Sequence, residues 1–214
     1  MVVIKKFTFG PFSENTFVVW DEKSGAGAVV DPGCFSKEEE DLLADFIEDR
    51  GINVKYLIVT HGHIDHVAGC DFVYHKYTPQ FFAPHADSEL IANVQMQGNM
   101  FGMKVKTVPS GYEPLTEKTE IYLGSSKMEF IFTPGHTPGE HCIYFPEEKI
   151  CITGDVLFQG SIGRTDLWGG DYDVLMNSIF EKLLILPDDT IIYPGHGSSS
   201  KIGIEKRDNS FLNF

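Results

Sequence analysis

The sequence has little cysteine, few basic residues and no long apolar run. Its four cysteines include no C-x-x-C pair, and their spacing is not that of a disulfide framework. Lys and Arg number 17 against 31 Asp and Glu, which gives a formal net charge of −14. Nucleic-acid binders need clustered basic residues to neutralise phosphate, and anionic membrane surfaces disfavour an acidic protein. We therefore expect neither nucleic acid nor a membrane as a partner.

Targeting signals are also missing from the sequence. The N-terminal run Met1-Val2-Val3-Ile4-Lys5-Lys6 is strand-like and lacks the charged start, apolar stretch and cleavage site of a signal peptide. No window reaches the roughly 18 apolar residues of a membrane-spanning helix. We expect a reduced, cytoplasmic protein, and the sequence leaves its oligomeric state open.

Strand-like and helix-like runs alternate along the chain, which predicts an α/β fold, and the absence of a linker-like stretch predicts one domain over residues 1–214. A helix should begin after Ser36, with Glu39 as the capping-box partner, and end at Gly51. Its apolar face would be Leu42, Leu43, Phe46 and Ile47. A second helix is predicted from Asp173 to about Leu186. Strands are predicted over Lys5–Phe9, Thr16–Asp21, Ala28–Asp31, Tyr56–Thr60, Met128–Thr133, His141–Phe145, Lys149–Thr153 and Thr190–Tyr193.

The segment Val94–Val108 is harder to interpret, because Gln, Gly and Asn alternate with Met96, Met100, Phe101 and Met103. Core filling is the favoured interpretation, since methionine commonly fills gaps in protein interiors. The alternative is an apolar lid beside a substrate site.

Four of the predicted strands run directly into turns that carry side chains able to bind metal ions. Because loops at one edge of an α/β sheet lie close together, such side chains can converge on one place. Glycines in these turns allow sharp bends and close approach of the backbone. The four turns are His61-Gly62-His63-Ile64-Asp65-His66, Pro134-Gly135-His136, Gly154-Asp155 and Gly195-His196.

The candidate ligands are too many for one ion. Zinc takes about four ligands when structural, or three and a water when catalytic. Seven ligands suit two ions with one shared carboxylate and a bridging water, and catalytic ion pairs lie about 3.5–4 Å apart. Imidazole and carboxylate donors favour zinc, with iron or manganese as alternatives. The seven are His61, His63, Asp65, His66, His136, Asp155 and His196, whereas His75, His85 and His141 are interpreted as ordinary polar residues.

The motif H-x-H-x-D-H, together with Val30-Asp31-Pro32-Gly33, resembles the metallo-β-lactamase superfamily over essentially the whole chain. The resemblance implies an αββα sandwich with a dinuclear metal site at one edge. By analogy, the first ion would be held by His61, His63 and His136. The second would be held by Asp65, His66 and His196. Asp155 would bridge the ions, and Asp31 would orient a histidine ligand from behind.

Within that superfamily the chain is most similar to glyoxalase II, the hydroxyacylglutathione hydrolases, and especially to small single-domain bacterial members. Segments 133–139, 160–166 and 195–197 carry this likeness. Full-length glyoxalase II has a C-terminal helical region that forms part of its glutathione site, and because this sequence ends soon after His196 we expect that region to be absent. Arg164 either grips a substrate carboxylate or pairs with Asp166. True lactamases are usually exported, and many carry Cys where this chain has Asp155, so an antibiotic-degrading role is not favoured.

These features predict a metal-dependent hydrolase of a small-molecule thioester, such as S-lactoylglutathione. A hydroxide that bridges the two ions would attack the carbonyl carbon, with Asp65 and Asp155 in the catalytic centre. The first alternative is an iron-dependent persulfide dioxygenase, because those relatives share the segment Gly163-Arg164-Thr165-Asp166. The second is a small phosphodiester hydrolase, because two-metal sites also suit in-line displacement.

Overall fold

Two six-stranded sheets face each other in the computed structural model, which describes residues 1–213. The first sheet contains, in spatial order, β1 (Val2–Phe9), β2 (Glu14–Asp21), β3 (Ala26–Val30), β4 (Asn53–Ile58), β5 (Gln80–Ala83) and β6 (Glu113–Pro114). The order in the second sheet is β14 (Ser200–Lys201), β13 (Ile191–Pro194), β10 (Ile150–Gly154), β9 (His141–Phe145), β8 (Ser126–Phe132) and β7 (Ile121–Leu123). A separate hairpin pairs β11 (Leu157–Phe158) with β12 (Ser161–Ile162).

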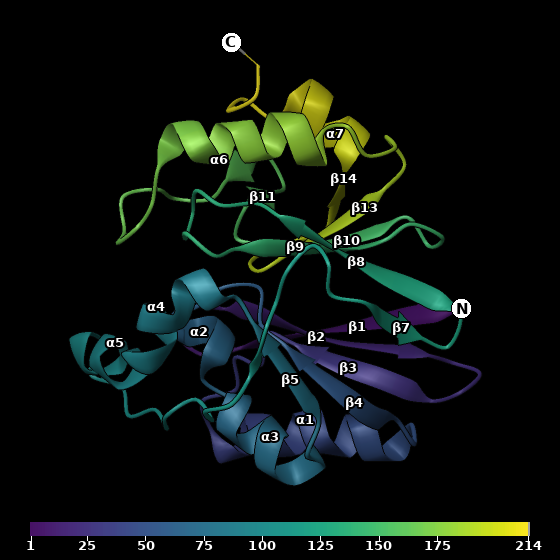
Figure 1. Ribbon diagram of the computed structural model, residues 1–214, viewed down its shortest axis with the longest axis vertical. Coiled ribbons are helices and arrows are strands. Elements are labelled where there is room, and N and C mark those ends of the chain that lie inside the picture. Colours follow the sequence, from purple (N-terminus) through teal and green to yellow (C-terminus); the bar gives the residue numbers. More distant parts are fainter. Residues whose placement is uncertain (214) are drawn as a thin grey trace.

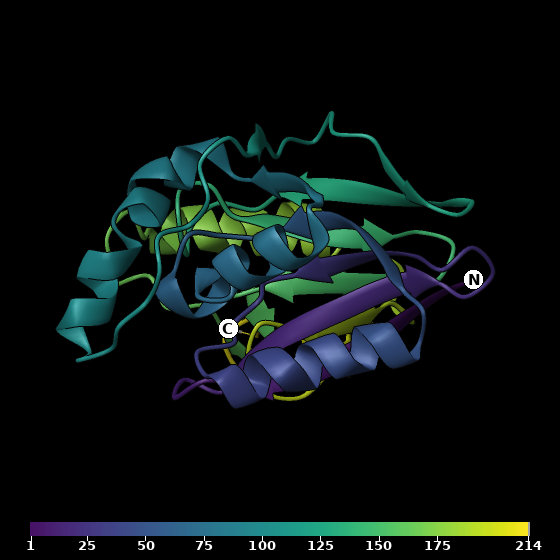
Figure 2. The same cartoon turned by 90° about the horizontal axis from the view of Figure 1, so that it is seen from below.

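Helices cover the outer faces of both sheets (Figure 1). On the first sheet lie α1 (Lys37–Asp49) and α3 (Cys70–Tyr77), and on the second lie α6 (Tyr172–Ser178) and α7 (Ile202–Asp208). The short elements α2 (Ile64–Val67), η1 (His85–Asp87), α4 (Ser88–Ala92) and α5 (Val94–Met100) follow β4 and β5. Figure 2 shows α5 at the end of the sandwich opposite the N-terminus. The predicted αββα sandwich is confirmed.

The apolar side chains of the protein form three layers, and successive side chains of β2 alternate between two of them. Phe17 and Val19 point into the core between the two sheets, where they join Ile143 and other buried residues of the second sheet. Their neighbours Val18 and Trp20 point outward into the core beneath α1 and α3. Successive side chains of a strand face opposite sides of its sheet, so a strand buried on both faces is apolar throughout. The third layer lies between the second sheet and the helices that cover it.

The first long helix begins as its sequence signals predict. Ser36 accepts a hydrogen bond from the backbone N–H of Glu39, and the Glu39 side chain accepts one from the backbone of Ser36. The predicted apolar face needs one correction, because Leu42 is 55% exposed while Leu43, Ala44 and Ile47 are buried. Ala44 is buried instead of Leu42. A search for large apolar residues does not identify this small side chain as part of the buried face.

Two other predictions also change. The helix expected from Asp173 to Leu186 is α6, followed by a short π-helical turn over Ile179–Leu183. The segment Val94–Val108 contains α5, and the favoured core-filling interpretation is wrong for Met96, Met100 and Phe101, which are exposed. Among residues 1–213, no helix is both long and apolar enough to cross a bilayer. One domain over residues 1–214 stays a prediction.

Candidate metal centre

All seven predicted ligand residues lie at one edge of the sandwich, where strands of both sheets end. The first sheet supplies the four in the turn after β4, where His63 is the N-cap residue of α2. The second sheet supplies three, each in the turn that follows a different strand: His136 after β8, Asp155 after β10 and His196 after β13. Chain segments far apart in sequence therefore meet at one site, as the strand-end pattern predicts.

Three groups of these side chains have ligand atoms within 4.8 Å of one another. Two of the groups share His61 and two share His66, so the groups form one continuous cluster rather than separate sites. The groups are His61, His63 and His136; His61, His66 and Asp155; and Asp65, His66 and His196.

The spacing of donor atoms around Asp155 fits metal coordination. Two donors bound at about 2.0–2.1 Å to a tetrahedral ion lie about 3.4 Å apart. The Asp155 Oδ1 atom lies 3.6 Å from His66 Nε2, and its Oδ2 atom lies 3.6 Å from His136 Nε2 and 3.5 Å from His196 Nε2. Asp65 Oδ2 lies 3.2 Å from His196 Nε2. One carboxylate thus reaches histidines from both predicted ligand sets.

Several of these atoms are buried without a protein partner. Among the described residues, His61 Nε2, His66 Nε2 and Asp155 Oδ1 have no hydrogen bond. A buried polar atom without a partner costs about 1–3 kcal/mol, so such a group of three requires an explanation. Each atom is a metal-ligand type and faces the cluster, so the residues present fit metal ions.

In three of the candidate histidine ligands, the ring nitrogen opposite Nε2 is held by the protein. The Nδ1 atom of His66 lies 3.1 Å from Asp31 Oδ2. The Nδ1 atom of His136 donates to the Arg164 carbonyl at 2.7 Å, and that of His196 to the Phe12 carbonyl at 3.1 Å. A proton held at Nδ1 leaves the Nε2 lone pair free to bind a metal ion.

Asp31 lies behind His66, in the position expected for an orienting residue. It also accepts hydrogen bonds from the Thr60 backbone N–H at 2.7 Å and from the Thr60 hydroxyl at 2.6 Å. Its backbone adopts the left-handed region, with φ of 48°, which Asp tolerates better than most residues. Its orienting role is a proposal that these three contacts support.

Glu140 is a buried residue of the centre that the sequence patterns did not single out. Its Oε1 atom accepts the backbone N–H of Asp155 at 2.6 Å and lies 3.4 Å from His61 Nδ1. The Thr60 hydroxyl, at 3.1 Å, is a second partner for His61 Nδ1. Glu140 directly precedes the fully buried β9, and a carboxylate at the entry of an apolar strand is the signal that could have identified it.

Two further polar residues fix the turns that carry ligands. Buried Asp87 accepts backbone N–H groups from Gly62 at 2.9 Å and Gly139 at 2.7 Å, so it joins the turns of two ligand motifs. Asn15 donates its amide to the carbonyls of Pro194 and Gly197, each at 2.9 Å, on either side of the turn with His196. Asp87 has no motif around it, which explains why sequence patterns missed it.

The electrostatics of the cluster favour the metal-binding forms of His61, His63 and Asp65, and the charged form of His66. Burial lowers the pKa of His61 well below its ordinary value and lowers that of His63 to about 3. Burial acts against the charged form of Asp65, but neighbouring histidines, led by His66, outweigh it and lower its pKa. Burial is likewise outweighed at His66, where carboxylates led by Asp155 raise the pKa. Neutral imidazole and ionised carboxylate bind metal ions, and the carboxylates that stabilise a proton at His66 also attract a divalent cation.

Glycine is required beside the cluster for space. A Cβ atom at Gly195 would lie 2.3 Å from Asp155 Oδ1 and 2.6 Å from His66 Cε1. At Gly154, where φ is 49°, it would lie 2.5 Å from Glu140 Oε1. Both distances are far shorter than a van der Waals contact, so the close approach expected of these glycines is confirmed.

A cleft of about 890 Å³ opens above the cluster. Five of the seven candidate ligands line it, and Arg164 lies on its wall. The Arg164 guanidinium makes a two-pronged pair with Asp166, at 2.7 and 2.8 Å, and both side chains are exposed. The predicted ion pair is therefore present, and Arg164 also borders the space where a substrate would bind.

The remaining histidines lie outside the three ligand groups. His141 is buried, and its Nδ1 atom donates to the Gly139 carbonyl at 2.7 Å. His75 is exposed beside Asp71, and His85 is exposed in η1.

Comparisons with known proteins agree with this geometry. The chain is 40% identical to hydroxyacylglutathione hydrolase GloC of Haemophilus influenzae over 204 residues, which covers 94% of each protein. Among solved structures, the BLEG-1 B3 metallo-beta-lactamase aligns with a TM-score of 0.90 at 29% identity, over 99% of this chain and 100% of that one. TTHA1623, crystallised in a di-iron-bound form, aligns with a TM-score of 0.86 at 32% identity, over 97% of this chain and 100% of that one. The sequence profile of the metallo-beta-lactamase superfamily matches residues 9–196, and the chain belongs to that superfamily.

Proposed function

We propose that the chain is a dinuclear metallohydrolase of acyl thioesters such as S-lactoylglutathione. The observation that carries the proposal is the group of buried ligand atoms without protein partners among the described residues, contributed by both sheets beneath a cleft that Asp155 lines. The 40% identity to a hydroxyacylglutathione hydrolase supports the thioester as the substrate class. Water would add its oxygen to the carbonyl carbon and the C–S bond would break. The products would be a carboxylate, a thiol and one proton.

The ligand sets follow the three groups. His61, His63 and His136 would hold one ion, and Asp65, His66 and His196 the other. Asp155 would bridge, since its two oxygens lie close to histidines of both sets. Zinc suits these donors, and the di-iron form of TTHA1623 makes iron a real alternative; manganese is a third.

Side chains around the ions have distinct roles in this proposal. When bound, the ions lower the pKa of a shared water and polarise the substrate carbonyl. Asp65, whose pKa is lowered, stays ionised at neutral pH and acts only as an acceptor. Asp155 is fixed by the hydrogen bond from its own backbone N–H to Glu140. Because Arg164 is exposed, its guanidinium can exchange Asp166 for a substrate carboxylate at small cost.

The test is hydrolysis of S-lactoylglutathione by zinc-loaded protein, with and without a chelator. A chelator-sensitive kcat/KM of about 10⁴ M⁻¹s⁻¹ or more is expected, which is the lower range of enzymes. Asp155→Ala should abolish turnover, while Asp189→Ala, an exposed acid paired with Lys149 on the surface, should not change it. Absence of turnover with two ions bound would contradict the proposal.

The same protein should be assayed on two competing substrate classes. A β-lactam is one, because the fold aligns with the BLEG-1 lactamase over nearly its whole length. Glutathione persulfide is the other, because the segment from Gly163 to Asp166 resembles persulfide dioxygenases. Oxygen uptake by protein containing a single ferrous ion would favour the dioxygenase and overturn hydrolysis.

A further inference from the structure

Exposed apolar side chains surround the mouth of the cleft. Met100, the last residue of α5 on one half of the chain, and Phe101, which caps that helix, are 77% and 58% exposed. Phe158, Leu167 and Trp168 line the cleft from the other half, and Trp168 is 54% exposed. Single exposed apolar residues are ordinary, but residues that together line one cleft indicate a binding surface.

These apolar residues are tied to the candidate metal ligands. The Phe12 carbonyl accepts the hydrogen bond from His196, and the Phe12 ring packs edge-on against Phe101 with centroids 5.0 Å apart. On the other half of the chain, the Phe158 ring lies 6.4 Å from the His196 ring. The apolar surface therefore begins beside the ligands, where the bond to be broken would lie.

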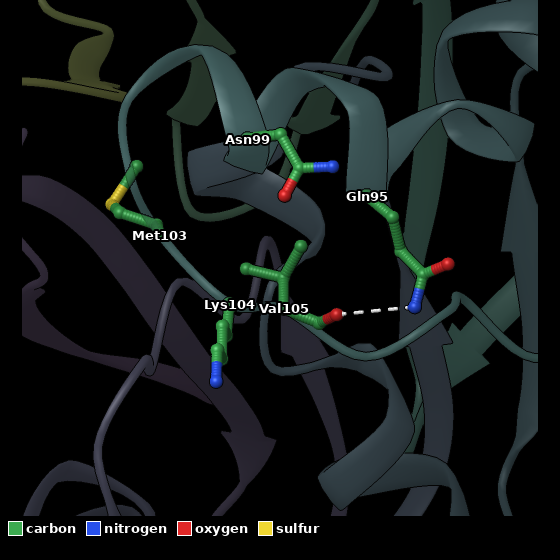
Figure 3. A pocket seen from close by; sticks show the side chains of 5 residues that line it. All are labelled: Gln95, Asn99, Met103, Lys104 and Val105. Atoms are coloured by element: carbon green, nitrogen blue, oxygen red, sulfur yellow. Dashed lines mark hydrogen bonds between the residues drawn. The ribbon is translucent and has the colours of Figure 1, made fainter.

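The helix that presents Met100 and Phe101 is held in place from both sides. The Gln97 amide donates to the carbonyls of Leu90 at 2.8 Å and Gly62 at 3.2 Å, and its oxygen accepts the backbone N–H of Ile64 at 3.0 Å. Behind the helix, a hollow of about 360 Å³ separates it from the following segment, and Gln95 reaches across to the Val105 carbonyl at 3.4 Å (Figure 3). The exposed side chains thus stand on a helix attached to the H-x-H turn.

Charge in the cleft is scarce. In the described part of the chain, Arg164 is the one charged lining residue besides the candidate ligands, and Asp166 pairs with it. Glutathione carries two carboxylates and an ammonium group at neutral pH, and each needs a partner when it leaves water. Arg164 can pair with one carboxylate of the thiol, and a hydrocarbon acyl chain would bury apolar area against Met100, Phe101 and Trp168.

Resting on the proposed thioesterase function, we infer that the cleft selects its substrate by an apolar acyl chain. The carbonyl would lie over the metal centre and the chain along the exposed apolar residues. Each methylene buried completely strengthens binding about fourfold, and partial burial gives about half of that free energy, or twofold. A chain longer by four methylenes should therefore raise kcat/KM by roughly tenfold or more.

The experiment compares thioesters that share one small neutral thiol. The acetyl, butanoyl, hexanoyl and octanoyl thioesters of N-acetylcysteamine are hydrolysed by zinc-loaded protein, and kcat/KM is plotted against chain length. We expect a hexanoyl-to-acetyl ratio of about ten or more. A ratio near one, with turnover present, overturns the inference and leaves the thioesterase proposal intact. No turnover on any thioester, S-lactoylglutathione included, overturns both.

Substitutions in the cleft test whether its exposed apolar residues determine the preference for long acyl chains. Phe101→Ala and Trp168→Ala should each lower the hexanoyl-to-acetyl ratio by about threefold or more, because each removes aromatic area from the chain's path. Phe211→Ala, a similarly exposed phenylalanine outside the cleft, is the matched control and should keep the wild-type ratio. Ratios equal to wild type in both cleft variants would contradict the inference even if wild-type protein prefers long chains.

Discussion

The metal centre and the cleft above it are built in opposite ways. In the centre, polar side chains are buried, and hydrogen bonds to carbonyls and carboxylates fix the histidine rings. In the cleft, large apolar side chains such as Met100, Phe101 and Trp168 are exposed to solvent. We propose that these two departures from the usual arrangement serve two tasks: the centre would determine which reaction occurs, and the cleft would determine which molecule undergoes it.

The largest effect is expected when the carboxylate of Asp155, proposed to bridge the two ions, is removed. Asp155→Ala takes away a donor near histidines of both sets, so affinity for both ions should fall by more than the roughly 10–100-fold that loss of an outer partner costs. Calorimetric titration with zinc measures the loss. Asp189→Ala should bind zinc as wild type does, and an Asp155→Ala variant that still holds two ions tightly would refute the ligand assignment.

Substitutions of Glu140 test how strongly a residue that contacts the candidate ligands, and not the metal, affects zinc affinity. Glu140→Ala removes the acceptor for the Asp155 backbone N–H and a neighbour of His61, so zinc affinity should fall about 10–100-fold. Glu140→Gln keeps an acceptor oxygen and should lose less. If both variants bind zinc as tightly as the wild-type protein while their melting temperatures fall, Glu140 stabilises the fold and does not support the metal centre.

Most of the centre follows from local sequence because its ligands stand directly after apolar strands. The strand-end pattern predicts His61, His136, Asp155 and His196 as ligands, since strand ends at one edge of a sheet converge. The capping box of Ser36 and Glu39 placed α1 equally well. In each case the signal lies within a few residues along the chain.

Other features depend on contacts that no local pattern contains. Asp87 is the last residue of η1 and Glu140 lies in the loop before β9, and their roles come from backbone N–H groups of other segments. The exposure of Met100 likewise follows from how Gln97 attaches α5 to the H-x-H turn. An apolar residue in a sequence predicts burial, and only tertiary structure shows where a binding surface exposes it.

Changes in the cleft should leave the centre and the fold unaffected. Met100→Ala alters a side chain that is 77% exposed, so the free energy of unfolding should change by less than about 0.5 kcal/mol. Zinc affinity should stay at the wild-type value while KM for hexanoyl substrates rises a few-fold. Denaturant titration and calorimetry check both statements, and a large loss of zinc affinity would show that the two regions are not separable.

The smallest effect is expected at the cysteines, all four of which are free and buried. Burial raises the pKa of Cys34 to about 12, so the thiolate is scarce at pH 8. An aromatic disulfide reagent should leave the native protein essentially unlabelled and react with four thiols per chain in denaturant. Rapid labelling of native protein would show that the interior around the centre is open to solvent.

The most direct test of the dinuclear centre is the number of ions bound per chain. Protein dialysed to equilibrium against zinc, and separately against ferrous iron under anaerobic conditions, would be analysed for metal content alongside Asp155→Ala. Two ions per wild-type chain and a clear loss in the variant are expected. One ion or none in wild-type protein, with the fold intact, would contradict a dinuclear centre.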